Sequence, residues 1–432
     1  MCRNLIYSKR KKLLFLNLIN KKLHFKTQKT MATPKQIAHQ NLGIKEGNKI
    51  ILSCDGGGMR GILTIQLLKK LESIAGSPCY QWCDMVAGTS TGGIIAGLIL
   101  KKKNAKEIED LYVKLVSRVF TRRNFLANRY YNPPAYDKEN YRNLLKDLIG
   151  NSTLEEVCTE TGLDCLITSK DLAAGEETFF TCVNNTEGYI GTYKSVLLRG
   201  VMEATMSAPT YFSPFERFTD GGTTTYNNPV MAAVLEALEY TGKDKYRDDE
   251  LTVFSLGTGT SLKFLAANKT QNPKGIDALF WLNYVMSETG KDASEMQIDT
   301  LRSGLIKDLD LRRYQISFDK ETMMKLPKES IAHIPSLRAD LLSELDDEVL
   351  ANIDMDDVTM FPLMISIGNA MVNFICPPNE AKLPIKQQKG NWFRSDFVNE
   401  KKRGILVSAK GDPQTIKNNL SSISWIDKQP TA

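Results

Sequence analysis

A serine between two glycines is the first group in the sequence whose setting suits a nucleophile. The segment 88–92 reads Gly-Thr-Ser-Thr-Gly, follows an expected strand at 84–87 and precedes an apolar helix expected at 94–100. A sharp turn between a strand and a helix exposes a serine hydroxyl at the carboxyl edge of a sheet. The helix N-terminus adds positive charge where an oxyanion would develop. An ordinary glycine turn with a helix-capping serine has the same pattern. The residues of this turn are Gly88, Thr89, Ser90, Thr91 and Gly92.

An earlier glycine-rich turn is a candidate anion site. The segment 55–61 reads Asp-Gly-Gly-Gly-Met-Arg-Gly and lies between an expected strand at 49–54 and an expected helix at 62–74. Consecutive glycines leave backbone N–H groups uncovered, and such a cradle binds a phosphate or a tetrahedral oxyanion. The turn also fits the dinucleotide pattern G-x-G-x-x-G, but only Glu72 stands near the position of the ribose-binding acid. Arg60 adds charge beside the cradle or pairs with an acid such as Asp55. The candidate residues are Gly56, Gly57, Gly58, Met59, Arg60 and Gly61.

A nucleophilic serine needs a base, and the sequence is poor in histidine. Two of the three histidines precede the first strand and the third lies far towards the C-terminus, at His24, His39 and His333. Asp220 stands before Gly221 and Gly222, ahead of an apolar helix expected at 230–238. A carboxylate can replace the imidazole if burial raises its pKa from about 3.9 towards the working pH. Ser90 and Asp220 therefore form a candidate dyad.

The elements around these motifs predict an α/β fold. Strand, glycine turn and helix occur twice in succession, which is typical of a parallel sheet. Helices are also expected at 107–120 and 202–207, and further strands at 165–169, 178–183 and 251–256. Beyond about residue 265 the alternation of apolar strands and glycine turns ends, and the apolar residues follow a helical spacing.

Composition and charge exclude several classes of protein. The 432 residues are 42% hydrophobic and 25% charged, as in an ordinary globular chain. The net charge of +6 is concentrated at the N-terminus, because residues 1–45 hold eleven Lys and Arg and no Asp or Glu. The remainder carries 45 basic against 50 acidic residues, a net charge of −5. A mildly acidic body does not indicate nucleic-acid binding.

The cysteines and the apolar runs bear on metal sites and location. Of the eight cysteines only Cys79 and Cys83 are close in sequence, and no second pair stands at zinc spacing. We therefore expect free thiols, no metal site and a reducing, cytoplasmic location, with peripheral contact to a membrane left open. No apolar run approaches the roughly 18 residues of a transmembrane helix. Residues 1–30 are either an extension upstream of a true start at Met31 or a targeting or membrane-surface segment.

The three motifs together resemble those of the patatin-like phospholipase family. Its signatures are Asp-Gly-Gly-Gly-x-Arg-Gly, Gly-x-Ser-x-Gly and Asp-Gly-Gly or Asp-Gly-Ala, which occur here in the same order at 55–61, 88–92 and 220–222. Further matches lie at 208–212, 227–229 and 255–259, so the resemblance covers about residues 47–260.

The resemblance implies a three-layer α/β/α fold with a central, mostly parallel sheet. It also implies hydrolysis of fatty-acyl esters of phospholipids or related lipids through an acyl-enzyme, without metal or cofactor. Ser90 would be the nucleophile, Asp220 the proton acceptor, and the amides around Gly57, Gly58 and Met59 the oxyanion hole. The partner would be a lipid at a membrane surface, and no nucleic acid.

The expected organisation has three parts. Residues 1–45 form a basic extension, 46–265 a patatin-like catalytic domain, and 266–432 a mainly helical region of unknown role. Two other functions stay open at this level. One is a phosphate- or nucleotide-binding protein that uses the Gly56–Gly61 turn, and the other is a catalytically silent binding or storage protein on the same fold.

Overall fold

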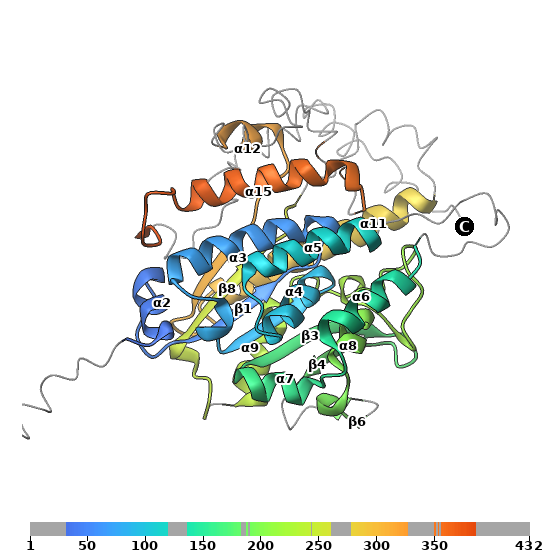
Figure 1. The fold of residues 1–432 in the computed structure, drawn as a ribbon, viewed down its shortest axis with the longest axis horizontal. Coiled ribbons are helices and arrows are strands. Elements are labelled where there is room, and N and C mark those ends of the chain that lie inside the picture. The colour runs from blue at the N-terminus through green and yellow to red at the C-terminus, as the bar shows by residue number, and fades with distance from the viewer. Residues whose placement is uncertain are drawn as a thin grey trace, which may run out of the picture.

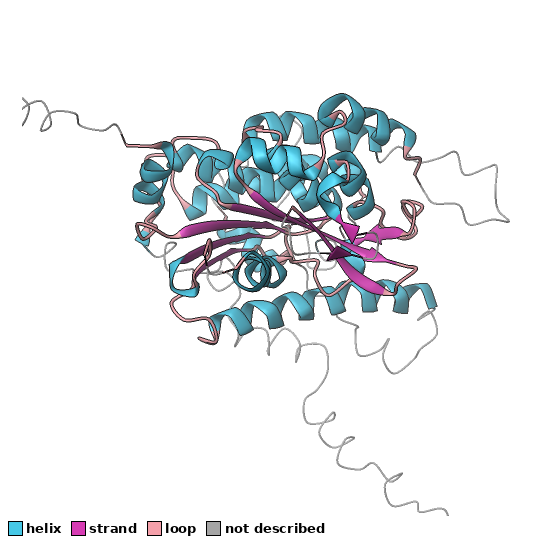
Figure 2. Cartoon of the chain, turned by 90° about the horizontal axis from the view of Figure 1, so that it is seen from below, coloured by secondary structure: helices cyan, strands magenta, loops and turns pink. Residues whose placement is uncertain are grey.

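A computed structural model describes residues 32–119, 136–182, 187–188, 191–242, 244–260, 278–326 and 356–385, together with residues 350 and 353. Helices cover both faces of a central sheet (Figures 1 and 2). Five of its strands are joined by parallel pairings, while two further pairings are antiparallel. The three-layer α/β/α fold with a mostly parallel sheet is therefore confirmed.

The central sheet has seven strands in the order β4-β3-β2-β1-β8-β9, with β7 also paired to β3. Strands β4 and β7 run antiparallel to β3. A separate short hairpin joins β5 to β6. The strands are β1 Lys49–Cys54, β2 Met85–Thr89, β3 Asp164–Asp171, β4 Glu176–Thr181, β5 Glu187–Gly188, β6 Gly191–Thr192, β7 Phe218–Asp220, β8 Leu251–Leu256 and β9 Asp310–Tyr314.

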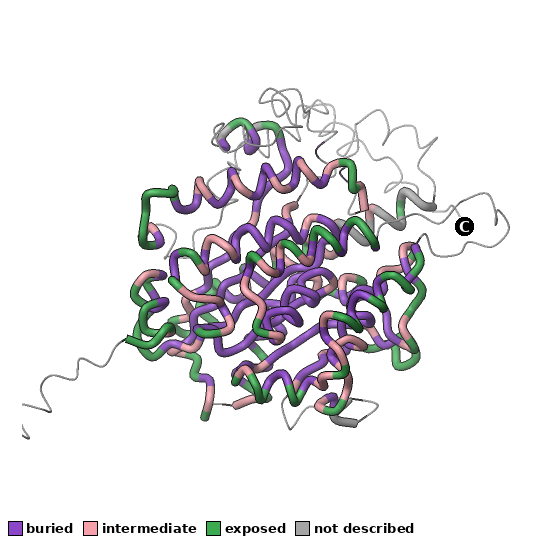
Figure 3. Tube along the Cα trace, in the orientation of Figure 1, coloured by how far each residue is buried: buried purple, intermediate pink, exposed green. Residues whose placement is uncertain are grey.

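Apolar residues at alternating positions of the strands belong to two hydrophobic cores, one on each face of the sheet. In β1, Ile50 and Leu52 face the larger core, whereas Ile51 faces the smaller one. This agrees with the burial of nearly every residue of β1 and β8, as expected for strands covered on both faces. Figure 3 shows that burial is concentrated along these central strands and the inner helices.

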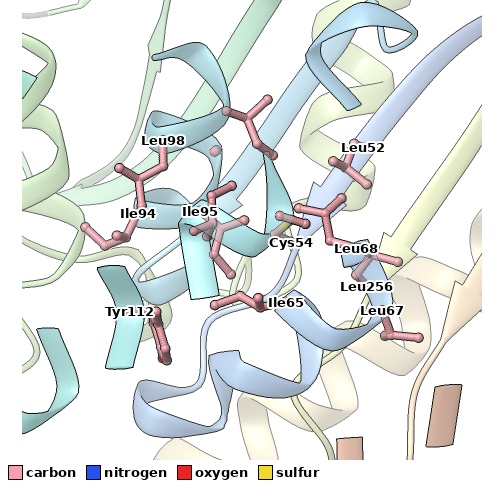
Figure 4. Packing of buried hydrophobic residues seen from close by; sticks show 14 of the residues in the cluster. Leu52, Cys54, Ile65, Leu67, Leu68, Ile94, Ile95, Leu98, Tyr112 and Leu256 are labelled. Carbon is pink, nitrogen blue, oxygen red and sulfur yellow. The ribbon is translucent and has the colours of Figure 1, made fainter. Parts of the chain in front are cut away.

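The larger core is covered by most of the helices, and the smaller core by α9 and α11. Close packing of α3 and α4 against β1 is visible around Ile65, Ile94 and Leu52 (Figure 4). The helices are α2 Pro34–Leu42, α3 Gly61–Ala75, α4 Thr91–Leu100, α5 Ala105–Val119, α6 Glu139–Ile149, α7 Leu154–Thr161, α8 Leu198–Thr205, α9 Val230–Leu235, α11 Ala278–Arg302, α12 Lys320–Lys325 and α15 Phe361–Ile375. A π-helical turn, Glu236–Thr241, extends α9.

The chain after residue 265 contributes a strand to the central sheet. Strand β9 pairs in parallel with β8, so that Ser255 lies opposite Arg313. Helical spacing alone did not predict this strand, because two of its five residues are arginines. Both Arg312 and Arg313 are nevertheless buried.

One described helical segment is long and apolar enough to cross a membrane. It spans Val358–Ile375, and half of it is buried inside the fold. Its helix α15 packs on α3, where a Cβ added to Gly368 would lie 2.8 Å from Cγ of Gln66. The segment is apolar on average and is not an uninterrupted apolar run, because Ser366, Asn369 and Asn373 lie within it. A core helix of a globular protein passes the same test of length and composition.

Candidate active site

Ser90 lies in a sharp turn between β2 and α4, as the glycine pattern predicts. Its backbone has φ 54° and ψ −123°, which is uncommon for a residue with a side chain. The turn is too tight for side chains on its glycines: a Cβ on Gly88 would lie 2.2 Å from the carbonyl oxygen of Gly92. A Cβ on Gly92 would lie 2.1 Å from the carbonyl oxygen of Cys54. Backbone strain of this kind is a feature of functional sites and needs support from the surrounding structure.

The surrounding structure holds the serine turn at three points. The amide of Ser90 donates a hydrogen bond of 2.8 Å to Oγ1 of Thr205, at the end of α8. Thr89 Oγ1 lies 2.6 Å from Thr168 Oγ1 and donates to the carbonyl of Tyr226 at 2.7 Å. Thr91 begins α4, and the carbonyl of Ser90 accepts from the amide of Ile94 at 3.1 Å. These contacts join the turn to β3, α8 and the segment after Asp220.

Sheet topology brings Asp220 to Ser90. Strand β3 pairs with β2 along one edge, and Thr89 lies opposite Thr168. Strand β7 pairs with the same edge of β3, beyond the point where β2 ends, and places Asp220 opposite Ser169. Because these pairings are consecutive, Ser90 and Asp220 meet end to end. The hydroxyl Oγ of Ser90 donates a hydrogen bond of 2.7 Å to Oδ2 of Asp220.

The Asp220 carboxylate is buried, with 3% of the residue exposed. Burial raises its pKa from 3.8 to about 6, although hydrogen bonds from Ser90 and from the amide of Gly222 oppose the rise. The Gly222 amide donates to Oδ1 at 2.6 Å, which fixes the carboxylate plane. Gly221 packs on β3, where an added Cβ would lie 2.1 Å from Oγ1 of Thr168. A carboxylate with a pKa near neutrality beside a serine hydroxyl can accept the proton of that hydroxyl.

The glycine-rich turn after β1 lies beside Ser90. A Cβ added to Gly56 would stand 3.2 Å from Cβ of Ser90 and 2.4 Å from the side-chain oxygen of Asn227. The amide of Gly56 donates to the carbonyl of Asn227 at 3.0 Å, and its carbonyl accepts from Thr258 Oγ1 at 2.8 Å. The Gly56 amide therefore already donates a hydrogen bond within the protein and is not free to bind an oxyanion. This residue belongs to the wall of the site and is not one of its open donors.

The next amides of the turn are better placed to receive an anion. Gly57 donates no backbone hydrogen bond to the part of the chain that the structure describes. Gly58 and Met59 begin a 3-10 turn, Gly58–Arg60, and amides at the start of a helical turn have no partner within it. Gly58 has φ 56°, a left-handed conformation that suits glycine, and its carbonyl accepts from the hydroxyl of Tyr112. The turn leads through Gly61 into α3, whose dipole adds positive potential.

Asp55 and Arg60, at the two ends of this turn, do not pair with each other. Asp55 is paired with Arg313 of β9, which donates to its two carboxylate oxygens at 2.8 and 2.5 Å. The guanidinium of Arg60 lies over the ring of Phe318, 6.0 Å from its centroid. Pairing of Arg60 with Asp55 is therefore wrong. The sequence did not predict the pairing of Arg313 with Asp55, because the two residues are 258 positions apart.

A buried polar network supports the strand that carries Asp220. The carbonyl of Ser207 accepts from the amide of Asp220 at 3.1 Å, and Ser207 Oγ accepts from Nζ of Lys138 at 2.7 Å. Lys138 is also 3.4 Å from Glu203, with both side chains buried. Burial lowers the pKa of Lys138, while Glu203 opposes that shift. Sequence reasoning did not single out these residues, although Ser207 directly precedes the matched segment 208–212.

The histidines do not form part of the described site. His39 lies on α2, and its Nδ1 is 3.2 Å from the carbonyl oxygen of Lys45, ahead of β1. That position is at the amino end of β1, opposite the end that carries the site. His24 and His333 lie outside the described residues. Within the described chain, the one group of three possible metal ligands is formed by Cys158, Cys165 and Cys182.

Comparison with known proteins finds similarity to phospholipases over the part of the chain that carries these motifs. The family model "Patatin-like phospholipase" matches residues 52–234. An Escherichia coli cUMP-AMP-activated phospholipase is 26% identical over 63% of this chain and 82% of its own length. A Vibrio cholerae cGAMP-activated phospholipase is 30% identical over 48% of this chain and 63% of its own length.

The human calcium-independent phospholipase A2-gamma is 27% identical over 71% of this chain. The match spans 42% of the human protein and 63% of the Vibrio protein, which is less than two thirds of either. The range that the family model matches includes the glycine-rich turn at 55–61, the serine turn at 88–92 and Asp220. On its strand–turn–helix motifs, its fold and these matches, the chain is similar to the patatin-like phospholipases.

Proposed function

We propose that the protein is a serine-type lipid acyl hydrolase in which Ser90 is the nucleophile and Asp220 is the general base. The observation that carries the proposal is the 2.7 Å hydrogen bond from Ser90 Oγ to a buried carboxylate whose pKa is raised to about 6. At neutral pH this carboxylate is mostly ionised. It nevertheless remains basic enough to hold a proton during the reaction.

In the first half-reaction, Ser90 Oγ attacks the ester carbonyl while its proton passes to Oδ2 of Asp220. The carbonyl oxygen becomes an oxyanion, which the amides of Gly57, Gly58 and Met59 would receive. Collapse of this tetrahedral intermediate breaks the bond to the leaving alcohol, which takes the proton from Asp220. The product is an acyl ester on Ser90.

In the second half-reaction, the same carboxylate acts as the general base for a water molecule. Asp220 removes a proton from a water molecule that attacks the acyl carbonyl, and the amides stabilise the second oxyanion. The fatty acid leaves, and the proton on Asp220 returns to Ser90 Oγ. One base thus performs both proton transfers, because the Gly222 hydrogen bond keeps Oδ2 directed at Ser90.

We propose phospholipids as the substrate class, with cleavage of a fatty-acyl ester bond. The names of all three relatives, each a phospholipase, support this choice. The human relative is named calcium-independent, and we extend that property to this chain, since no ligand cluster of the described residues surrounds Ser90. A phosphate-binding role for the glycine turn is less well supported, because the Gly56 amide is bonded to Asn227.

The test is hydrolysis of vesicles made from phospholipids with a different acyl chain at each glycerol position. Mass spectrometry of released fatty acids and lysolipids should show both products with the wild-type protein. Neither should form with Ser90→Ala. A fluorophosphonate probe should label Ser90 in the folded wild-type chain. Labelling at another serine, or lipid release by Ser90→Ala at more than a few per cent of the wild-type rate, would refute the proposed nucleophile.

A further inference from the structure

Three thiols converge at the end of β3 that is remote from Ser90. Cys158 belongs to α7, Cys165 to β3, and Cys182 directly follows β4. Their sulfur atoms all lie within 4.8 Å of one another, and the thiol of Cys158 donates to the sulfur of Cys165 at 3.6 Å. The sequence gives no hint of this group, because the spacing of the three cysteines matches no metal-binding motif.

The fold itself brings these thiols together. Strands β3 and β4 are antiparallel, with Leu166 opposite Thr181, so the next pair in register is Cys165 and Cys182. Cross-strand neighbours point to the same face of a sheet. Helix α7 ends at a left-handed Gly162 and leads directly into β3, which brings Cys158 over the same face. Three separate elements therefore hold the sulfur atoms, and no bound group is needed to gather them.

We propose that Cys158, Cys165 and Cys182 bind one thiophilic d¹⁰ metal ion, Zn²⁺ or Cu⁺, through three thiolates. Soft thiolate ligands select these two ions. A Zn–S bond of about 2.3 Å places tetrahedral ligand sulfurs about 3.8 Å apart. The sulfurs already stand close to that spacing, so small side-chain rotations would complete the site. With three protein ligands, Zn²⁺ would keep a fourth position for water, whereas Cu⁺ would be three-coordinate.

Charge around the thiols suits this role. Lys245 pairs with Asp164 at 2.7 Å, beside Cys165. Binding of the metal would release the protons of the three thiols. The trithiolate complex would carry a charge of −1 with Zn²⁺ or −2 with Cu⁺, which Lys245 would partly offset.

The site would be structural with respect to ester hydrolysis. Cys165 lies opposite Val86, while Thr168 lies opposite Thr89, the residue before Ser90. At about 3.3 Å per residue, three residues of β3 separate the levels of Cys165 and Thr168 by about 10 Å. A metal ion here would tie α7 to two neighbouring strands. Cys182 is partly exposed, which gives the ion a route of entry, whereas Cys158 and Cys165 are buried.

The experiment uses the full chain, reduced and stripped of metal. Titration with Co²⁺, a spectroscopic substitute for Zn²⁺, should give a thiolate-to-cobalt charge-transfer band that saturates at one equivalent. Competition with a chromophoric chelator then measures the affinity for Zn²⁺, and a Cu⁺-specific chelator does so for Cu⁺. Zn²⁺ or Cu⁺ should also protect Cys182 from alkylation in the wild-type protein.

Cys158→Ser and Cys182→Ser should each lower the affinity more than about 100-fold, since loss of a group that only orients a ligand already costs about 10–100-fold. Cys376→Ser is the matched control, because Cys376 is buried elsewhere, and its affinity should equal that of the wild type. Circular dichroism and soluble-ester activity report whether each variant is folded. Alkylation of the wild type tests the proposal independently of the variants.

Three results would overturn the proposal. The first is binding of less than half an equivalent of both metals with unprotected Cys182. The second is equal affinity in the wild type and the two ligand variants. The third is a Cys158–Cys165 disulfide, formed under mild peroxide, in a protein whose reduced form takes up no metal. That last outcome would identify a redox pair in place of a metal site.

Discussion

Arg313 holds Asp55 from across the sheet, and this pair fixes the start of the glycine-rich turn. The guanidinium donates to both carboxylate oxygens and, at 2.9 Å, to the hydroxyl of Ser255. Both partners of the ion pair are buried, with 2% and 4% of their side chains exposed. Asp55 also donates its amide to the carbonyl of Leu256 at 3.0 Å. The chain beyond residue 265 thus contributes directly to the wall of the candidate active site.

Replacing Arg313 with methionine should lower both stability and activity. Burial raises the pKa of Asp55 while Arg313 opposes that shift, so the variant would leave an unpaired acid that takes up a proton. Breaking a buried ion pair by removing one partner costs about 3–5 kcal/mol of unfolding free energy. Because Asp55 adjoins Gly56, we also expect kcat on a soluble ester to fall about tenfold or more, from displaced oxyanion donors. Thermal unfolding and steady-state kinetics well below the melting temperature measure the two effects.

Arg312→Met separates the loss of stability from the loss of positioning. Arg312 is buried in the same strand, but it pairs with Asp310 and donates to the carbonyls of Leu42 and Gly43. This variant should melt at a lower temperature and keep near-normal kcat while folded. Equal kcat losses in the two variants would mean that Arg313 has no specific role in placing the turn.

The pH profile should report the Asp220 carboxylate. Its pKa of about 6 in the free protein means that kcat/KM on a soluble ester should be level near pH 8 and fall below pH 6, by about tenfold for each further pH unit. Protonation removes the base, so the loss follows decreasing pH. An acid limb centred near 4, where an unperturbed aspartate titrates, would contradict the raised pKa.

Asp220 should also reduce the stability of the folded protein above pH 6. A carboxyl group whose pKa is higher in the folded than in the unfolded state binds more protons when folded, so stability falls as pH rises between the two values. With a pKa raised from 3.8 to about 6, the loss amounts to about 3 kcal/mol. Asp220→Asn should therefore unfold at higher denaturant concentration than the wild type at pH 8. The difference should vanish below about pH 4.

Ester hydrolysis should need no metal ion. EDTA should leave the rate on a soluble ester unchanged, because the three-thiol group lies at the opposite end of β3 from Ser90. The assay is repeated with Cys182→Ser, which removes one of the three candidate ligands. A rate that falls on chelation and recovers with added metal in both proteins would place a metal in the reaction itself.

Local sequence patterns predicted the elements that carry the chemistry. Strands β1 and β8 were expected at the observed bounds, because a short, mainly apolar run that ends in glycines is typical of a buried strand. The turn at Ser90 was predicted for the same reason. The meeting of Ser90 and Asp220 depends on β7 continuing the edge of β2, which is a property of strand pairing and not of either motif.

Long-range pairing accounts for what the sequence did not reveal. Strand β9 was missed because Arg312 and Arg313 are charged, and their burial makes sense only with partners far away in the chain. The Gly56 amide is bonded to the carbonyl of Asn227, which lies 171 residues later in the chain. The three thiols come together only through the register of β3 with β4. No spacing pattern contains this information, since each contact joins segments that only the folded sheet brings together.

The claim that Asp220 is the base is tested most directly by comparing Asp220→Asn with His333→Ala on a soluble ester at pH 8. Asparagine keeps the size and a hydrogen-bonding group but cannot take the Ser90 proton. General-base assistance contributes about 10²–10⁴-fold, so kcat/KM of Asp220→Asn should fall by at least that lower bound, while His333→Ala should match the wild type. An active Asp220→Asn together with an inactive His333→Ala would contradict the dyad and require a histidine base.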